Sequence, residues 1–363
     1  MADLDIFLVG LPGLEDALTA EAVERGFTGA KQVRGGVEVT GDWAEVWRAN
    51  RELRGASRVL VRLGSFKAKG LGQLEAEART FRWLDHLAPR EPVRLDITCR
   101  KSRVNHAGAA AQKIERALRS AQIPVVPTAD LTLKIRIDHD LCGISADTSG
   151  APLHKRGHKE AVSKAPLRET MAALFLRRCG WTPGMTVVDP FCGSGTIPIE
   201  AAEISAGLIP GRSRSFAFET LPSFNPAQYS MLGNTLGTPT PGRFIGYDKD
   251  QGAIRSATQN AARAGVDCDF ACQPVAELTV PEGPPGLVLC NPPYGARIGS
   301  PKALTGLYET LGARLKDGFK GWKVGVVTSE ESLARATGLP FGAKGPPIAH
   351  GGLKVWLFQT KPL

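Results

Sequence analysis

The stretch VVDPFCGSGTIPIEAA, residues 187–202, decides the fold of this 363-residue chain. The two valines predict a short buried strand, CGSG predicts a tight turn, and the apolar residues from Thr196 onward predict a helix. A glycine turn between a strand and a helix lets a nucleotide-like ligand approach the backbone amides at the start of the helix. We therefore predict a nucleotide-binding turn at the edge of a parallel sheet.

Strands and helices alternate around this stretch, and the strands are apolar throughout, as in a parallel sheet that is covered on both faces. The expected strand cores are 187–188, 244–246, 287–289 and 324–327, and the expected helices are 195–204, 251–264 and 303–316. This alternation predicts a Rossmann-like, doubly wound α/β domain over residues 151–363.

Residues 1–150 show shorter and more mixed elements, which predict α+β structure. Over residues 1–55 we expect strands at 6–9 and 36–40, a helix at 14–25 and a second helix from Trp43; over residues 56–150 we expect strands at 58–63, 93–98 and 131–138 and helices at 73–87 and 109–119. The strict alternation of 131–138 places Lys134 and Arg136 on one exposed face of its strand. Two small domains are therefore predicted before the α/β domain.

Composition and charge exclude some classes of protein. No apolar run is long enough to span a bilayer and the first residues are acidic, so we expect a cytoplasmic protein. The seven cysteines are scattered and form no CxxC pair, which favours free thiols and predicts no metal site. Residues 51–180 hold 25 Lys and Arg against 13 Asp and Glu, a net charge of +12 within a total of +9. Clustered basic charge suits a polyanion such as RNA, and a basic face that serves solubility is the alternative.

The acid that ends the first strand bears on the identity of the ligand. A carboxylate at Asp189 repels a pyrophosphate but suits the cationic methionine end of S-adenosylmethionine. The turn also lacks the third glycine of the dinucleotide fingerprint. We therefore expect S-adenosylmethionine as the cofactor, bound by Asp189, Phe191, Gly193, Ser194, Gly195 and Thr196.

Asp248 ends the second strand, where a carboxylate can accept hydrogen bonds from both ribose hydroxyls of a nucleoside. Asp250 is the alternative ribose ligand, and whichever aspartate does not bind the ribose is expected to cap the next helix. Lys249 is placed to cover the adenine. Gln273 follows the third strand, where related folds offer an acid to the adenine amine, and its amide is expected to take that place.

The segment Asn291-Pro-Pro-Tyr294 follows the strand at 287–290 and predicts the chemistry. An exocyclic amine on a purine is a poor nucleophile because its lone pair is delocalised, so it needs hydrogen-bond acceptors. The amide oxygen of Asn291 and the carbonyl of Pro292 can take its two N–H bonds, and the rigid Pro292 and Pro293 hold that carbonyl in place. Tyr294 is expected to stack on a base that has left its helix.

Together these motifs resemble the THUMP-domain class I RNA methyltransferases, and they are similar to the bacterial enzymes that form N2-methylguanosine in 23S ribosomal RNA. The resemblance covers nearly the whole chain. Beyond the two motifs above, it rests on 13–15, 35–37, 48–50, 56–60 and 102–105, and on the junction segments 147–150, 153–157 and 165–169.

The resemblance implies a ferredoxin-like domain over residues 1–55, a THUMP RNA-binding domain over 56–150 and a class I methyltransferase domain over 151–363. It implies that Ala165, Pro166 and Leu167 pass beside the cofactor, as does Asn291. Basic side chains near the active-site mouth and on the THUMP domain are expected to contact RNA: Lys101, Arg103, Lys155, Arg156, His158 and Lys159. The alternative for residues 155–159 is a solvated linker.

The expected function is the formation of N2-methylguanosine in structured RNA. The segments 102–105 and 206–242 favour 23S rRNA, and the alternative substrate is the acceptor stem of tRNA. Because NPPY also serves adenine N6 methylation, a nucleic-acid adenine methyltransferase is a further alternative. No membrane association, metal or obligate protein partner is expected.

Overall fold

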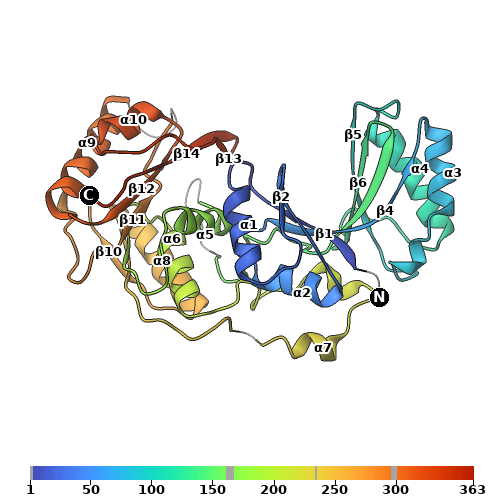
Figure 1. Cartoon of the computed structure of the whole chain (residues 1–363), viewed down its shortest axis with the longest axis horizontal. Coiled ribbons are helices and arrows are strands. Elements are labelled where there is room, and N and C mark those ends of the chain that lie inside the picture. Colours follow the sequence, from blue (N-terminus) through green and yellow to red (C-terminus); the bar gives the residue numbers. More distant parts are fainter. Residues whose placement is uncertain (1–2, 161–166, 234, 296–300) are drawn as a thin grey trace. The chain divides into compact units, whose positions relative to one another are not determined.

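The computed structural model describes residues 3–160, 167–233, 235–295 and 301–363. The chain forms two compact units, each built on its own seven-stranded sheet (Figure 1). The first unit comprises Met1–Gly10, Thr19–Leu153 and Arg214–Gly233, and the second comprises Leu11–Leu18, His154–Ser213 and Asn234–Leu363. Neither unit is therefore a single continuous stretch of sequence.

The sheet of the first unit has the strand order β2-β3-β1-β4-β7-β6-β5. Its strands are β1 (Leu4–Val9), β2 (Lys31–Val33), β3 (Gly36–Gly41), β4 (Arg58–Lys67), β5 (Arg94–Arg100), β6 (Thr132–Asp138) and β7 (Leu141–Asp147). Only β5 and β6 run parallel, and the other neighbours are antiparallel. The long strand β4 pairs with β1 on one side and with β7 on the other, so one sheet continues across the two small domains predicted from the sequence.

The helices of the first unit are α1 (Glu15–Glu24), which begins in the second unit, α2 (Trp43–Glu52), α3 (Leu71–Thr80) and α4 (Ala107–Ser120). Asp42 caps α2 by accepting a hydrogen bond from the amide of Glu45 at 3.1 Å. The predicted helix at 73–87 is wrong beyond residue 80. The backbone becomes extended at Phe81, and a short 3₁₀ helix (Trp83–Asp85) follows. The Trp83 indole donates a hydrogen bond to the carbonyl of Ala78 at 2.8 Å, which fixes this short helix against the end of α3.

Residues 214–233 contain a 3₁₀ turn (Ala217–Thr220) and α7 (Pro226–Ser230), and they pack within the first unit. Phe218, Phe224 and Tyr229 surround the buried indole of Trp47. The guanidinium of Arg51 donates to the carbonyls of Leu232 and Gly233 and lies over the Tyr229 ring. This aromatic packing explains why residues 214–233 belong to the first unit although the chain before and after them belongs to the second.

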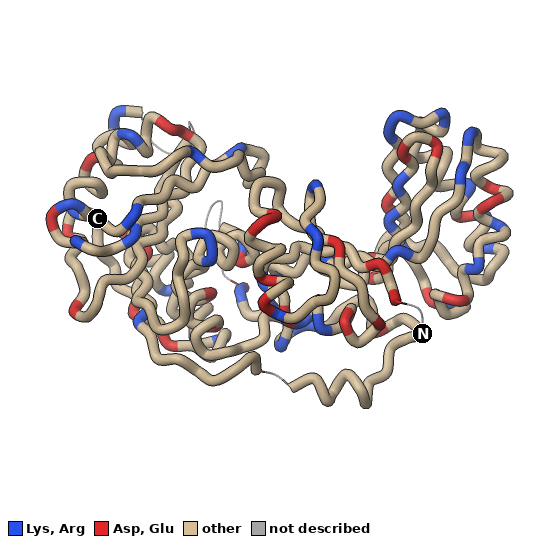
Figure 2. Tube along the Cα trace, in the orientation of Figure 1, with Lys and Arg blue, Asp and Glu red and all other residues tan. Residues whose placement is uncertain are grey.

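Acidic and basic residues are interspersed along the part of the first unit that carries β5, β6, α3 and α4 (Figure 2). Many of the basic residues here pair with a neighbouring acid: Lys134 with Asp96, Arg136 with Asp138, Arg119 with Glu115, and Lys113 with Glu75. Much of the positive charge that clusters in the sequence is thus locally compensated.

The sheet of the second unit has the order β10-β9-β8-β11-β12-β14-β13. Its strands are β8 (Val187–Asp189), β9 (Phe244–Asp248), β10 (Asp269–Cys272), β11 (Leu287–Cys290), β12 (Lys323–Thr328), β13 (Ile348–His350) and β14 (Leu353–Gln359). The first five strands of this order run parallel, and β14 pairs antiparallel with both of its neighbours, β12 and β13. Strands β8, β9, β11 and β12 carry the buried apolar residues that the sequence predicts, whereas β10, at the edge of the sheet, is largely exposed.

Helices cover both faces of this sheet (Figure 1): α5 (Glu169–Arg178), α6 (Thr196–Ser205) and α8 (Gln251–Ala264) on one, and α9 (Pro301–Gly318) and α10 (Glu331–Ala336) on the other. A short 3₁₀ helix (Val275–Glu277) follows β10. The face under α9 forms a core in which Tyr308, Leu311 and Leu315 pack against Val288 and Val326. Within the described residues, no helix is both long and apolar enough to cross a bilayer.

Candidate active site

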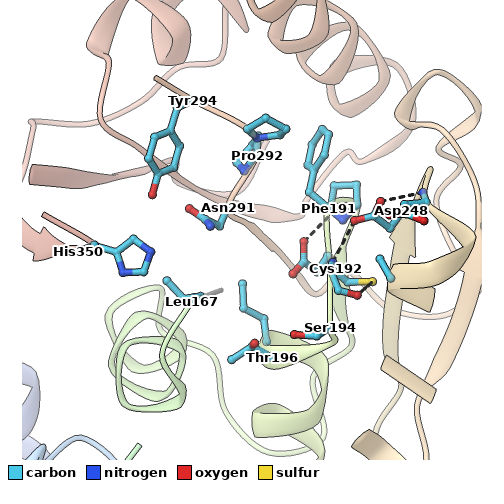
Figure 3. A pocket seen from close by; sticks show the side chains of 18 of the residues that line it. Leu167, Phe191, Cys192, Ser194, Thr196, Asp248, Asn291, Pro292, Tyr294 and His350 are labelled. Atoms are coloured by element: carbon cyan, nitrogen blue, oxygen red, sulfur yellow. Dashed lines mark hydrogen bonds between the residues drawn. The ribbon is translucent and has the colours of Figure 1, made fainter. Parts of the chain in front are cut away.

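A cavity of about 2020 Å³ opens in the second unit at the carboxyl ends of β8, β9 and β11 (Figure 3). This is where open α/β sheets bind their ligands. Its lining runs from the turn after β8, past the end of β9, to Asn291–Gly295 and the hairpin between β13 and β14. The volume is about twice the upper end of a typical small-molecule site, so it can hold a nucleoside cofactor and a base together.

The turn after β8 is tied to the neighbouring strand end. Asp189 Oδ1 accepts a hydrogen bond from the Phe191 amide at 3.0 Å, and the Gly193 amide donates to Asp248 Oδ2 at 3.1 Å. Gly195, at φ +85°, begins α6, and a Cβ there would lie 2.9 Å from the Phe270 ring. A residue with a side chain would therefore strain the backbone and displace the packing at this turn.

Two polar groups of this turn suit a cationic, hydroxyl-rich cofactor. Burial, with the nearby charge of Asp248, raises the pKa of Asp189 to about 8, because the carboxylate is shielded from water. A cation that pairs with Asp189 would stabilise the charged carboxylate in place of that water. The buried Ser194 hydroxyl has no hydrogen-bond partner among the described residues, although Ser194 lines the cavity. Such an unpaired buried group is expected to be satisfied by a ligand. The residues of the turn therefore fit S-adenosylmethionine.

The structure separates the roles of the two aspartates after β9. Asp250 caps α8, since its carboxylate accepts a hydrogen bond from the Gly252 amide at 2.7 Å. Asp248 accepts from Asp250 and Gly193 amides and lies in the cavity wall beside Lys249. Asp250 is thus engaged as a helix cap, which leaves Asp248 as the candidate ribose ligand.

Gln273 also lines the cavity. Its side-chain nitrogen donates to the carbonyl of Glu277 at 2.6 Å, which leaves its side-chain oxygen as the group that can accept from an adenine amine. The backbone amide of Gln273 donates to the carbonyl of Asp248, so the ends of β9 and β10 are held together here.

Asn291, Pro292, Pro293 and Tyr294 follow β11 and line the other side of the cavity. The Asn291 Oδ1 atom is buried and accepts no hydrogen bond within the part of the chain that the structure describes. Figure 3 shows the Asn291 side chain directed into the cavity with the Tyr294 ring beside it. Burial raises the pKa of Tyr294 to about 12, so its phenol stays neutral at physiological pH.

Glu330 supports this segment and was missed by the sequence analysis. Its Oε1 accepts a hydrogen bond from the Gly295 amide at 3.1 Å, and its own amide donates to the Thr328 hydroxyl at 3.2 Å. The carboxylate therefore ties the turn after Tyr294 to the end of β12. Nothing in the sequence distinguishes Glu330 from the acids around it.

Of the three residues expected to pass beside the cofactor, Leu167 is buried and lines the cavity. Ala165 and Pro166 lie outside the described residues.

The basic residues at 155–159 fall into two groups. Arg156 is only 1% exposed and pairs with the buried Glu200 at 3.0 Å. The imidazole of His158 is buried 3.5 Å from Glu203. Neither side chain is placed to contact RNA phosphates, because each faces a carboxylate of α6 inside the unit. The pKa of His158 is lowered by burial, against the opposing effect of Glu203.

Lys155 and Lys159 line the cavity, and Lys155 is exposed. The Lys159 amine pairs with Glu169 at 3.0 Å and donates to the Thr196 hydroxyl at 2.8 Å. Lys159 therefore bridges the starts of α5 and α6.

Lys101 and Arg103 lie in the first unit, in the loop after β5. Both are exposed, and Lys101 has a φ of +45°. The loop is fixed by Asp140, which accepts from the Arg103 amide at 2.8 Å and donates through its own amide to the Ser102 hydroxyl at 3.0 Å. This network presents the two basic side chains on an ordered turn.

No group of three or more His, Cys, Asp or Glu residues within the described ranges could hold a metal ion.

Two family models match the chain. Residues 156–343 match the RMKL-like methyltransferase domain, and residues 5–60 match the RlmL ferredoxin-like domain.

Individual proteins are similar over most of the chain. The ribosomal RNA large subunit methyltransferase K/L of Syntrophotalea carbinolica is 33% identical over 93% of this chain, which spans only 51% of that relative. The chain thus has about half the length of this relative. The Synechocystis protein named "Putative RNA methyltransferase slr0064" is 30% identical over 96% of this chain and 94% of its own length. The solved structure of SMU.472 complexed with SAH matches 100% of this chain and 99% of its own, with a TM-score of 0.88 and 25% identity.

Proposed function

We propose, since this chain belongs to the RMKL-like methyltransferase family, that it transfers a methyl group from S-adenosylmethionine to the exocyclic N2 amine of a guanine in large-subunit ribosomal RNA. The single observation that carries the proposal is the buried Asn291 Oδ1 atom, which accepts no hydrogen bond from any described residue and faces the cavity. Leaving such an acceptor unpaired costs about 1–3 kcal/mol, which a substrate donor recovers.

The two acceptors explain how a poor nucleophile is activated. In the proposed complex one N2 hydrogen bonds to Asn291 Oδ1 and the other bonds to the Pro292 carbonyl, which Pro293 helps to hold rigid. Accepting both hydrogens draws the nitrogen toward a tetrahedral geometry and turns its lone pair toward the cofactor side. In the proposed reaction the bond between the methyl group and the cofactor sulfur would break as the N–C bond forms, and one N2 proton would then be lost to water, so no general base is required for the attack.

S-adenosylmethionine supplies an electrophilic methyl carbon when it is bound. Asp189 would hold its methionine ammonium, Asp248 its ribose hydroxyls and Gln273 its adenine amine. Ser194 supplies a buried hydroxyl to the same ligand. Tyr294 would stack on the guanine, because its neutral ring borders the cavity beside Asn291.

RNA would be held by basic side chains in both units. We assign this role to Lys101 and Arg103 on their ordered turn and to Lys155 at the cavity, whereas Arg156 and His158 are buried against carboxylates of α6. Residues 56–150 would form the THUMP RNA-binding domain, following the ferredoxin-like segment 1–55 and preceding the methyltransferase domain 151–363. An rRNA substrate would place the enzyme in the cytoplasm.

Nucleoside analysis tests this function. The protein is incubated with tritium-labelled S-adenosylmethionine and, separately, with unmodified large-subunit rRNA and unmodified tRNA, and the labelled nucleoside is identified. We expect N2-methylguanosine in rRNA. Label in tRNA alone would mean that the substrate is tRNA and not rRNA. Label in N6-methyladenosine would refute the assignment of guanine as the target base.

A further inference from the structure

His350 is a buried polar residue of the cavity to which neither the family match nor the mechanism above gives a role. It ends β13 and is only 7% exposed. Neither of its ring nitrogens has a hydrogen-bond partner within the described ranges, although the ring lines the cavity. Figure 3 shows the His350 ring near Asn291 and Tyr294, at the opposite side of the view from Asp248. His350 therefore lies on the side of the cavity that the base would occupy.

The position of His350 is fixed by close packing. Residues Ile348–His350 pair with β14, and Ile348 is 1% exposed. Gly13, at φ +95°, lies so close to this strand that a Cβ would be 2.9 Å from the Pro347 carbonyl and 3.3 Å from Ile348. The imidazole is thus carried on a strand that is paired with β14 and packed against Gly13, and a buried ring without partners costs free energy unless a ligand supplies them.

We infer that His350 recognises the target base by donating a ring N–H to the O6 carbonyl of guanine. This inference rests on the proposed function. When Asn291 and Pro292 hold the N2 hydrogens, O6 is the polar atom at the opposite end of the same base edge, and His350 lines the cavity near Asn291. Among the natural bases, only guanine combines a 2-amine with a 6-carbonyl.

The protonation state is consistent with this role. Burial and, to a lesser extent, the positive charge of Arg168 lower the pKa of His350. A neutral imidazole carries one N–H donor and one acceptor nitrogen, so it can donate to a carbonyl without bringing a buried positive charge to the base.

The test compares two bases in two enzymes. Once the methylated nucleotide has been mapped, the rRNA fragment is assembled by ligation with either guanosine or 2-aminopurine riboside at that position. The analogue keeps the 2-amine but has a C–H in place of the 6-carbonyl. Single-turnover methylation rates are measured for the wild type and for His350→Leu, with His350→Gln as the variant that keeps an N–H donor.

We expect the wild type to methylate guanosine about 10- to 100-fold faster than the analogue, as one buried hydrogen bond requires. His350→Leu should methylate both RNAs at similar, low rates, and His350→Gln should regain part of the preference for guanosine. An equal preference in the wild type and in His350→Leu would overturn the inference.

A purely structural role for His350 gives a different result. If His350 acts by recognising the base, His350→Leu should leave thermal stability unchanged or raise it, because leucine removes a buried imidazole that has no partner, and cofactor affinity should stay within about twofold of the wild type. A loss of stability with an unchanged preference between the two RNAs would assign His350 to packing. Absence of N2-methylguanosine with the wild type would instead refute the proposed function, which keeps the two failures distinct.

Discussion

Replacing Asp189 with Asn should stabilise the protein while weakening cofactor binding. Burial raises the pKa of Asp189 to about 8, against 3.8 for an ordinary Asp. Between these values the folded protein binds a proton that the unfolded chain does not, so the free energy of unfolding falls as the pH rises from about 4 to about 8. The loss is about 1.4 kcal/mol per pH unit, or about 4 kcal/mol at pH 7.

Asparagine keeps the geometry and removes the titration. Its amide oxygen can still accept from the Phe191 amide, which Asp189 does at 3.0 Å. Denaturant unfolding of Asp189→Asn and wild type between pH 5 and 8 should give a stability difference that widens with pH in favour of the variant. Asp267→Asn, which changes an exposed carboxyl of the same unit, is the matched control and should follow the wild type.

Asp189→Asn should also lower the affinity of the protein for S-adenosylmethionine. The amide cannot pair ionically with the methionine ammonium, so the Kd for S-adenosylmethionine should rise about 10- to 100-fold, as for the loss of a charged hydrogen bond. In the wild type the pairing ionises Asp189, so calorimetry in buffers of different ionisation enthalpy should show a proton released on binding near pH 7. A parallel pH dependence of stability in both proteins, or a variant less stable at pH 8, would refute this account of Asp189.

Five further substitutions, in three experiments, test the remaining parts. Tyr294→Ala should lower methylation about 10- to 100-fold through lost stacking and Tyr294→Phe should lower it little, as single-turnover rates would show; equal losses would contradict stacking. Arg156→Met should destabilise the protein by about 3–5 kcal/mol, because Glu200 loses its buried partner, without changing the salt dependence of RNA binding; urea unfolding and filter binding measure the two effects. Lys101→Ala and Arg103→Ala should each weaken RNA binding and reduce the slope of log K against log salt by about 1, and an unchanged slope would remove that residue from the RNA contacts.

The family, the fold class and the cofactor predicted from the sequence are confirmed by the family matches and the similar solved structure. These predictions succeeded because local rules dominate at 187–202, where a buried strand, a glycine turn and a helix follow one another in sequence. The methyltransferase assignment follows from the family, while guanine N2, the rRNA substrate and the domain borders stay proposals.

Errors arose where distant contacts decide the structure. The predicted helix at 73–87 ends early where Phe81 turns its ring toward Phe66 and Gly64 of β4. Residues 214–233 leave the methyltransferase unit because their aromatic side chains bury Trp47. No strand was predicted over 141–147, where β7 pairs with β4 and β6.

The basic segment 155–159 shows what a closer study of the sequence could have found. Glu200 and Glu203 lie on one side of an otherwise apolar helix, and buried carboxylates need cationic partners. That pattern predicts that nearby basic side chains pair with these carboxylates inside the protein. In the structure Arg156 pairs with Glu200 in this way. His350 carries no comparable signal, since an isolated histidine before two glycines is not distinctive in sequence.

The measurement that tests the amine-acceptor mechanism most directly is the single-turnover rate of Asn291→Ala with rRNA, taken together with its affinity for S-adenosylmethionine. Removing one preorganised hydrogen-bond group of this kind costs about 100- to 1000-fold in rate. We predict a loss of at least this size, with a cofactor Kd within about twofold of the wild type. Turnover close to that of the wild type would show that the unpaired Asn291 oxygen does not activate the amine.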